Sequence, residues 1–328
     1  MVSSVLDHLL EDILAQKEKK HRELVAISVD SCLGDALKLL RRHNILALPV
    51  YGQKGHWLGV GGDTDAIDGD KHYIGLLSIL DITIYLTNLA MEVDAAKPNS
   101  PVDAPRPHAH GMDTLDSVSV RTLLGKSPES QTLWIAKPGD KLSACIEPLS
   151  KGVHRLLVPQ PIGESAGFHL ITQSDIIRYI LSILNEDPNL RAKASTSLAV
   201  LGLAPDGADK RVLTVDKDVS LLAALKGMSD WGINAIPVVN EAKNGVLTGT
   251  LSISDLRQVP ARTDIFELLS EMKKLTVAQF LDRVKIGGEY SGGDIHHVHR
   301  IWIVNDARVP IGIVTLTDII HAILELGK

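Results

Sequence analysis

One short pattern occurs four times in this chain of 328 residues. In each copy an apolar stretch ends in Ser or Thr, and an Asp follows three positions later, where another apolar stretch begins. The four pairs are Ser78 and Asp81, Thr172 and Asp175, Ser252 and Asp255, and Thr315 and Asp318. Similarity on this scale is typical of one supersecondary unit used several times, so it limits the possible folds more than any other feature.

A second apolar strand precedes each pair and lengthens the repeat. Its second residue lies 35, 21, 21 and 19 positions before the Asp, so only the first copy is unusually long. A stretch rich in Gly and Asp at about 52–71 accounts for the excess and predicts an inserted loop. Apolar residues at helical spacing precede the strand in three copies, as at Leu33, Leu37 and Leu40. The unit is predicted to run strand, helix, strand, strand, helix.

Two copies carry a pair of basic residues in that preceding strand. His154-Arg155 and His299-Arg300 occupy equivalent positions in the second and fourth copies, where the others have Leu46-Ala47 and Asn234-Ala235. Arg presents a planar fork that matches phosphate oxygens, and His adds a donor whose charge is tuned near neutrality. Two occurrences at one register favour phosphate binding over incidental charges at an exposed strand end.

The repeated Ser/Thr and Asp have two interpretations. A hydroxyl at a helix N-cap, with an acidic residue three positions later, resembles a capping box, and for a single copy we favour capping. A carboxylate at a helix start is also well placed to accept both hydroxyls of a ribose, while the hydroxyl holds the sugar or a phosphate. Because four copies follow strands at similar spacing, we predict nucleotide binding as well, and the two roles are compatible.

Four units that each close on Ser/Thr-x-x-Asp resemble four cystathionine-β-synthase (CBS) domains, over about residues 22–328. The His-Arg pairs resemble the gamma subunit of AMP-activated and SNF1-type protein kinases, and segments 55–62 and 71–75 resemble the plant gamma-like proteins. The resemblance implies a mixed αβ fold of the α/β type, with four tandem CBS domains forming two CBS-pair (Bateman) modules, 24–184 and 195–326, around a central polar cavity.

The expected domain boundaries follow the repeats. The predicted segments are an N-terminal helix at 1–22, CBS domains at 23–92, 120–186, 195–260 and 270–328, an inserted loop at 52–71 and a Pro-rich flexible linker at 93–119. In the fourth copy four glycines within 287–293 shorten the first helix to about 277–284.

The resemblance implies a set of nucleotide-binding residues, with AMP, ADP or ATP as ligands, no cofactor and no catalytic residue. The residues implied for ribose and hydroxyl contacts are Ser78, Asp81, Thr172, Asp175, Ser252, Asp255, Thr315 and Asp318, and those for phosphate are His154, Arg155, His299 and Arg300. This chain departs from the family twice, because kinase gamma subunits place an Arg at the Leu46-Ala47 register and animal subunits lack the acid of Asp175. The occupied sites are therefore expected to differ from the animal pattern.

Composition narrows the class of partner and compartment. A formal charge of −6 and a pI near 6.1 argue against nucleic acid, and no uninterrupted apolar stretch approaches the length of a membrane helix. Cys32 and Cys145 lie at apolar helix positions, as expected in a reducing cytoplasmic or nuclear compartment. The histidines at 296, 297 and 299 lack a Cys or acidic residue at a convincing spacing, so we expect no metal site.

These features bear on three possible functions. The first is a non-catalytic, adenine-nucleotide-binding regulatory subunit of an SNF1-related kinase, with alpha-type catalytic and beta-type scaffold subunits as partners. The alternative is a stand-alone CBS-domain adenylate sensor that regulates another enzyme or a transporter. An enzyme acting on nucleotides is disfavoured, because four similar carboxylates indicate four similar binding sites. Trp57, in the insert, is either a partner contact or a cover for its own repeat.

Overall fold

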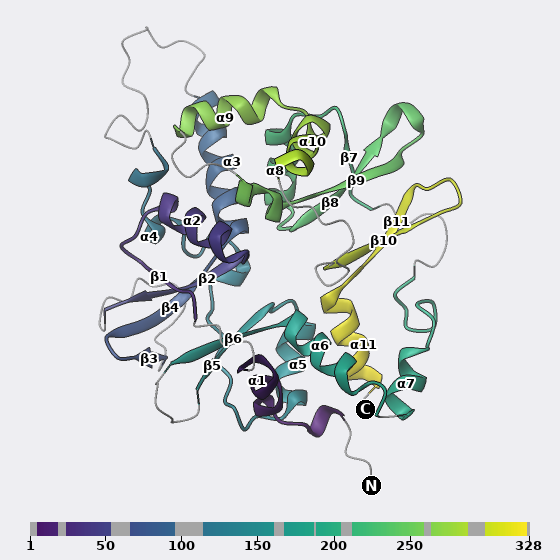
Figure 1. The fold of residues 1–328 in the computed structure, drawn as a ribbon. Coiled ribbons are helices and arrows are strands. Elements are labelled where there is room, and N and C mark those ends of the chain that lie inside the picture. The colour runs from purple at the N-terminus through teal and green to yellow at the C-terminus, as the bar shows by residue number, and fades with distance from the viewer. Residues whose placement is uncertain are drawn as a thin grey trace, which may run out of the picture. The chain divides into compact units, whose positions relative to one another are not determined.

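The computed structural model describes residues 5–18, 24–53, 66–95, 114–160, 167–186, 188–204, 212–258, 264–287 and 299–326. The chain forms two compact mixed αβ units, and each is assembled from separate stretches of sequence (Figure 1). Unit 1 comprises 1–24, 133–212 and 293–328, and unit 2 comprises 25–132 and 213–292. Unit 1 therefore holds the second and fourth repeats, and unit 2 the first and third. The compact units cut across the modules predicted in chain order.

Unit 2 contains two sheets built alike. In the first repeat the strand order is β1-β2-β4-β3. Strand β1 (Ile27–Ser28) is parallel to β2 (Ala47–Gly52). Strand β4 (Lys71–Ser78) is antiparallel to both β2 and β3 (Ile67–Asp68). In the third repeat β7 (Val215–Asp216) is parallel to β8 (Ala235–Asn240), which is antiparallel to β9 (Val246–Ser252). The predicted order of strand, helix, strand, strand, helix is confirmed for the first repeat.

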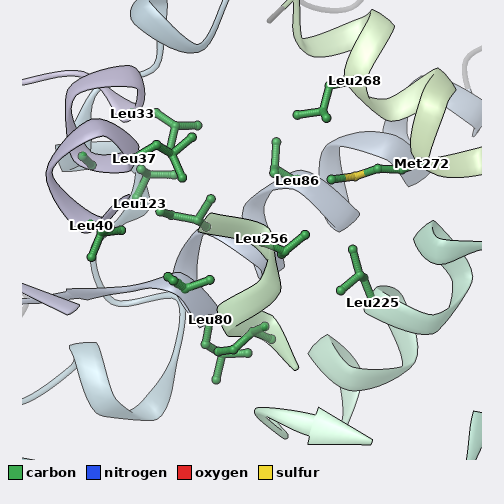
Figure 2. Packing of buried hydrophobic residues seen from close by; sticks show 14 of the residues in the cluster. Leu33, Leu37, Leu40, Leu80, Leu86, Leu123, Leu225, Leu256, Leu268 and Met272 are labelled. Carbon is green, nitrogen blue, oxygen red and sulfur yellow. The ribbon is translucent and has the colours of Figure 1, made fainter. Parts of the chain in front are cut away.

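The helices of unit 2 enclose one apolar core (Figure 2). They are α2 (Leu33–His43), α3 (Ile79–Ala95), α4 (Val120–Leu123), α8 (Leu221–Asp230), α9 (Ile265–Lys274) and α10 (Val277–Gly287), with short 3-10 turns η2 (Leu115–Ser117), η3 (Pro128–Ser130), η4 (Glu241–Lys243) and η5 (Ile253–Gln258). Leu33, Leu40 and Leu225 are almost fully buried there. Each such side chain contributes about 1.5–3 kcal/mol through removal from water.

Unit 1 is organised around two antiparallel strand pairs. They are β5 (Arg155–Pro159) with β6 (Phe168–Thr172), and β10 (Arg300–Val304) with β11 (Pro310–Thr315). Its helical segments are η1 (Val5–Asp7), α1 (Leu10–Glu18), α5 (Leu142–Ser150), α6 (Gln173–Ile183), α7 (Pro188–Ala194) and α11 (Leu316–Leu326). Helix α11 contacts both α5 and α6, and Leu142, Ile176 and Ile320 are fully buried in the shared core.

Segments that precede one repeat pack on another. Helix α1 comes before the first repeat but belongs to unit 1, where Leu10 N donates to the carbonyl of Asp140 at 2.9 Å. The segment before the second repeat lies in unit 2 instead, where Leu33 N donates to the carbonyl of Val118 at 2.7 Å. Helix α10 joins the third repeat through a 2.9 Å bond from Val277 N to the carbonyl of Val219.

The compact units divide the chain differently from the predicted CBS domains. Residues 120–132, assigned to the second CBS domain, and 270–287, assigned to the fourth, lie in unit 2 with the first and third repeats. The linker expected at 93–119 is wrong at both ends, because α3 continues to Ala95 and because Leu115 and Val118 are buried. Apolar burial determines these limits, and the Pro-rich stretch of the predicted linker, 96–113, lies outside the described residues.

Other predictions are refined or lie outside the described residues. The helix expected at 1–22 is resolved into η1 and α1, and the helix expected at 277–284 extends to Gly287. The end of the predicted 52–71 loop is a hairpin, in which Ile67 and Asp68 pair with His72 and Lys71. Residues 54–65, with Trp57, and 288–298, with the histidines at 296 and 297, are outside the described part. Within that part no helix is long and apolar enough to cross a membrane.

Candidate functional site

The four repeats pair equivalent positions of their two antiparallel strands. The hydroxyl residue at the end of one strand pairs with a residue of the antiparallel neighbour, and the four pairs are Ala47 with Ser78, Arg155 with Thr172, Ala235 with Ser252, and Arg300 with Thr315. The sequence alignment of the repeats is therefore also a structural equivalence. Arg155 and Arg300 occupy positions that hold Ala in the other two repeats.

Each acidic residue caps the helix or turn that follows its strand. The backbone N–H of the hydroxyl residue donates to Oδ2 of the Asp at 2.8 Å for Asp81, 2.9 Å for Asp175, 2.9 Å for Asp255 and 2.7 Å for Asp318. The hydroxyl donates to the same oxygen in three copies, whereas Ser252 Oγ donates to the carbonyl of Asn234. The capping interpretation is confirmed, and what distinguishes the four carboxylates is their remaining surroundings.

Asp81 is enclosed completely by its own unit. Its exposed fraction is 0%, and Oδ1 accepts from Ser127 N at 2.7 Å and from Ser130 Oγ at 2.5 Å. Burial raises the pKa of Asp81, although the bonds from Ser130, Ser78 and Ser127 work in the opposite direction. Both carboxylate oxygens of Asp81 accept hydrogen bonds and are inaccessible to solvent, and they connect the first repeat to η3. These contacts favour a structural role over ribose binding.

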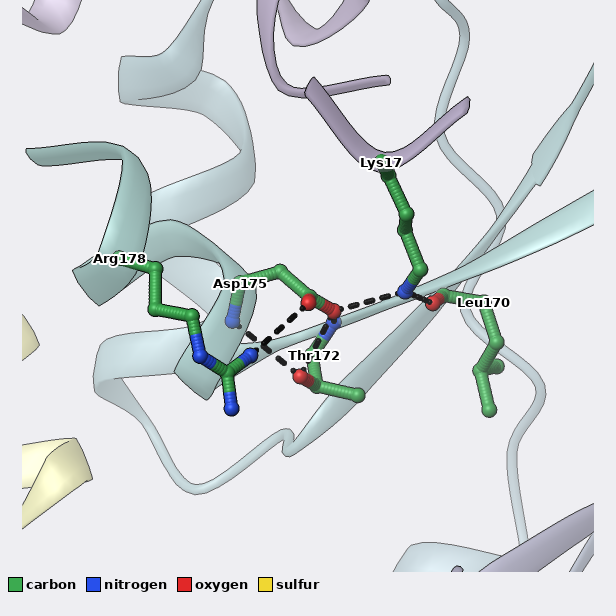
Figure 3. A network of polar contacts seen from close by, with 5 residues as sticks. All are labelled: Lys17, Leu170, Thr172, Asp175 and Arg178. Carbon is green, nitrogen blue, oxygen red and sulfur yellow. Dashed lines mark hydrogen bonds and ion pairs between the residues drawn. The ribbon is translucent and has the colours of Figure 1, made fainter. Parts of the chain in front are cut away.

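Asp175 is engaged by two cations (Figure 3). Lys17 Nζ lies 2.8 Å from Oδ2 and also donates to the carbonyl of Leu170, while Arg178 Nη1 lies 3.3 Å from Oδ1. Burial alone would raise the pKa of this carboxyl, but the charge and hydrogen bond of Lys17, together with the side-chain and backbone hydrogen bonds of Thr172, hold the pKa below its ordinary value. Both oxygens therefore already have partners from this chain.

The third and fourth carboxylates differ from these two. Asp318 is partly exposed, and among the described residues the hydrogen bonds that it accepts all end at Oδ2, from Thr315. Asp255 lies on η5 beside Arg257, whose pKa is lowered by burial and raised by the charge of Asp255, with a net lowering. Arg257 was not predicted; its side chain also donates to the carbonyl of Ser254 and to Asn44.

Unit 1 gathers the predicted phosphate residues with two of the carboxylates. His154-Arg155 and His299-Arg300 belong to the same unit as Asp175 and Asp318, whereas Ser78, Asp81, Ser252 and Asp255 belong to unit 2. His299 is exposed, and the other three basic residues are half-buried. The basic pairs are thus concentrated in the unit formed by the second and fourth repeats.

A buried glutamine connects the two acidic sites of unit 1. Gln173 follows Thr172 directly, and its Nε2 donates to Thr317 Oγ1 at 2.8 Å and to the carbonyl of Leu149 at 3.0 Å. Thr317 in turn precedes Asp318, so the first turns of α6 and α11 meet. The sequence did carry a signal for Gln173, because the other three copies have Ile79, Ile253 and Leu316 at this position.

Comparison with known proteins matches two of the four repeats, the third and the fourth, to a known family. The CBS domain family matches residues 208–262 and 258–325. The SNF1-related protein kinase regulatory subunit gamma-like PV42b of Arabidopsis thaliana is 24% identical over 98% of this chain and 96% of its own length. Its relative PV42a, also from Arabidopsis thaliana, is 26% identical over 93% of this chain and 92% of its own length.

The fold is shared with a solved archaeal structure. The protein MJ1225 of Methanocaldococcus jannaschii, described as a homologue of g-AMPK, superposes with a TM-score of 0.57 at 14% identity, over 92% of this chain and 96% of its own. At that identity the likeness concerns the fold alone. Residues 208–325 therefore match the CBS domain family, and the chain along nearly its whole length resembles the plant gamma-like regulatory subunits of SNF1-related kinases.

Proposed function

We propose that this chain is a non-catalytic gamma-type subunit of an SNF1-related or AMP-activated protein kinase and that it binds adenine nucleotides. The arrangement at Asp318 is the observation that carries the nucleotide proposal. Its Oδ2 is held by Thr315, and Thr315 pairs across the strands with Arg300. Thr315 therefore connects a candidate ribose acceptor, Asp318, with a candidate phosphate cation, Arg300. The same unit also holds the second His-Arg pair.

In this proposal different residues of unit 1 bind the ribose and the phosphates of the nucleotide. The ribose hydroxyls donate to the carboxylate of Asp318, which is oriented by the cap before any ligand arrives. The phosphate oxygens of AMP, ADP or ATP accept from Arg300, His299, Arg155 and His154. Arg supplies paired donors, and the partial burial of Arg300, Arg155 and His154 strengthens their charge-assisted bonds relative to bulk water. No covalent bond forms or breaks, so the consequence of binding is regulatory.

Asp255 is proposed as a second, weaker site in unit 2. It shares the cap geometry, since Ser252 N donates to Oδ2 at 2.9 Å. The strand residue opposite Ser252 is Ala235, so this site lacks the Arg that the fourth repeat supplies at the same register. We therefore expect Asp255 to bind the nucleoside portion, with fewer cationic contacts to the phosphates.

Asp318→Asn is expected to weaken AMP and ATP binding by about 30- to 150-fold. Two charge-assisted hydrogen bonds from the ribose are lost in part, which corresponds to about 2–3 kcal/mol. Isothermal titration calorimetry measures the change. Asp306→Asn, which removes an exposed carboxylate from the turn between β10 and β11 in the same unit, serves as the control and should bind as the wild type does. Unchanged affinity in Asp318→Asn would contradict the proposal.

The kinase assignment is tested separately from nucleotide binding. The observation favouring it over a stand-alone adenylate sensor is similarity to plant gamma-like regulatory subunits along nearly the whole chain. Purified chain is expected to capture the alpha-type catalytic and beta-type subunits of an SNF1-related kinase from a defined mixture. Nucleotide binding without capture of either subunit would instead favour the alternative, a stand-alone sensor of another enzyme or a transporter.

A further inference from the structure

Helix α1 is anchored firmly on the second repeat. Leu10, Ile13 and Leu14 are at most 2% exposed within the core of unit 1. Near the end of the helix, Gln16 Nε2 donates to Ser182 Oγ of α6 at 3.0 Å. Burial of three large apolar side chains makes α1 a fixed part of the unit. The position of Lys17, the next residue, is therefore determined by the packing of the helix that carries it.

Lys17 contacts both a backbone carbonyl and the carboxylate at the second acidic site. Its ammonium lies between the last strand of the repeat, where it meets the Leu170 carbonyl, and the first turn of α6, where it meets Asp175 Oδ2 at 2.8 Å (Figure 3). The Lys17 and Asp175 side chains are only 30% and 17% exposed. This is a partly buried ion pair, and Arg178 covers the other carboxylate oxygen.

The second and fourth sites of unit 1 are otherwise built alike. Both have a capping Thr that donates its N–H and its hydroxyl to Oδ2, and both have an Arg opposite that Thr in the neighbouring strand. Among the described residues, the salt bridges at these two carboxylates all belong to Asp175. The difference between the sites is therefore the cations on the carboxylate, and Lys17 comes from outside the repeat.

We propose that Lys17 determines which acidic sites accept a nucleotide, by occupying the Asp175 carboxylate and closing the second-repeat site to ribose. This inference rests on the nucleotide binding proposed above. A ribose hydroxyl is neutral, so on replacing Lys17 it would leave the ammonium without its counter-ion in a partly buried place. Breaking such a pair is costly, whereas a ribose at Asp318 displaces no such cation of the described chain.

The test is the number of AMP molecules bound by the full chain, measured by isothermal titration calorimetry. Lys17→Ala is expected to bind one more AMP than the wild type, and the added binding should disappear in Lys17→Ala/Asp175→Asn. Asp175→Asn alone should leave the wild-type number unchanged. Lys151→Ala, which removes an exposed lysine that pairs with Glu147 in the same unit, is the matched control and should not add a site. Lys17→Gln provides a second uncharged variant that retains a long side chain.

The outcomes separate this inference from the function on which it rests. AMP binding with the same number of sites in the wild type, Lys17→Ala and Lys17→Gln would overturn the role of Lys17 and leave the proposed function standing. Failure of every variant to bind AMP would overturn both. A drop in the number of sites in Asp175→Asn alone would show that the second site is open in the wild type, and would also overturn the inference.

Discussion

Asp81→Ala is expected to lower the free energy of unfolding of unit 2 by about 3–5 kcal/mol, an effect expected when one partner of a buried polar network is removed. The substitution leaves Ser78 N and Ser127 N, which donate to Asp81 at 2.8 and 2.7 Å, without their acceptor in a fully buried place. Urea denaturation, monitored by circular dichroism, measures the change in the free energy of unfolding.

Asp81→Asn is the informative companion, because it keeps the shape. Each carboxylate oxygen accepts from a backbone N–H, which cannot reverse its direction. An amide must therefore point its own NH₂ at one of these donors, and we expect Asn to restore little of the lost stability. Full stability of the Asn variant would mean that Asp81 does not bind both donors as an anion.

The pKa of Asp81 adds a dependence on pH that can be checked with the same measurements. Burial raises the pKa of Asp81 above the ordinary 3.8, so the folded state retains a proton that the unfolded state has lost. The contribution of Asp81 to stability therefore falls as pH rises from about 3.8 through the raised pKa. Asp81→Ala should remove this component, so the difference between the variant and the wild type should vary with pH across that window.

Leu115→Ala is expected to lower the free energy of unfolding of unit 2 by about 2–5 kcal/mol, as for other buried Leu side chains truncated to Ala. Leu115 is 0% exposed and packs in the core beside α2, although composition places it in a linker. Urea denaturation is again the measurement. Leu213→Ala is the control, because Leu213 is 43% exposed in the same unit and should cost little. Equal stability of the two variants would restore the linker interpretation.

The local structure of the repeats was predictable because neighbouring residues determine it. Apolar stretches and helical spacing, with the Ser/Thr and Asp pairs, predicted the strands and the caps that Thr172 and Thr315 form. The partners of the carboxylates were not predictable. Lys17 lies 158 positions from Asp175, and Ser130 lies 49 positions from Asp81, so no sequence period relates them. Only tertiary packing shows which carboxylates are already occupied.

Neither half of this sequence contains a complete compact unit. The chain passes between the units at 24/25, 132/133, 212/213 and 292/293, so each half of the sequence supplies one repeat to each unit. A fragment with only the first two repeats would have two incomplete cores, and a second copy of that fragment offers the matching apolar surfaces. Such a half-length chain is therefore suited to a two-fold homodimer, in which the partner supplies what the third and fourth repeats supply in the intact protein.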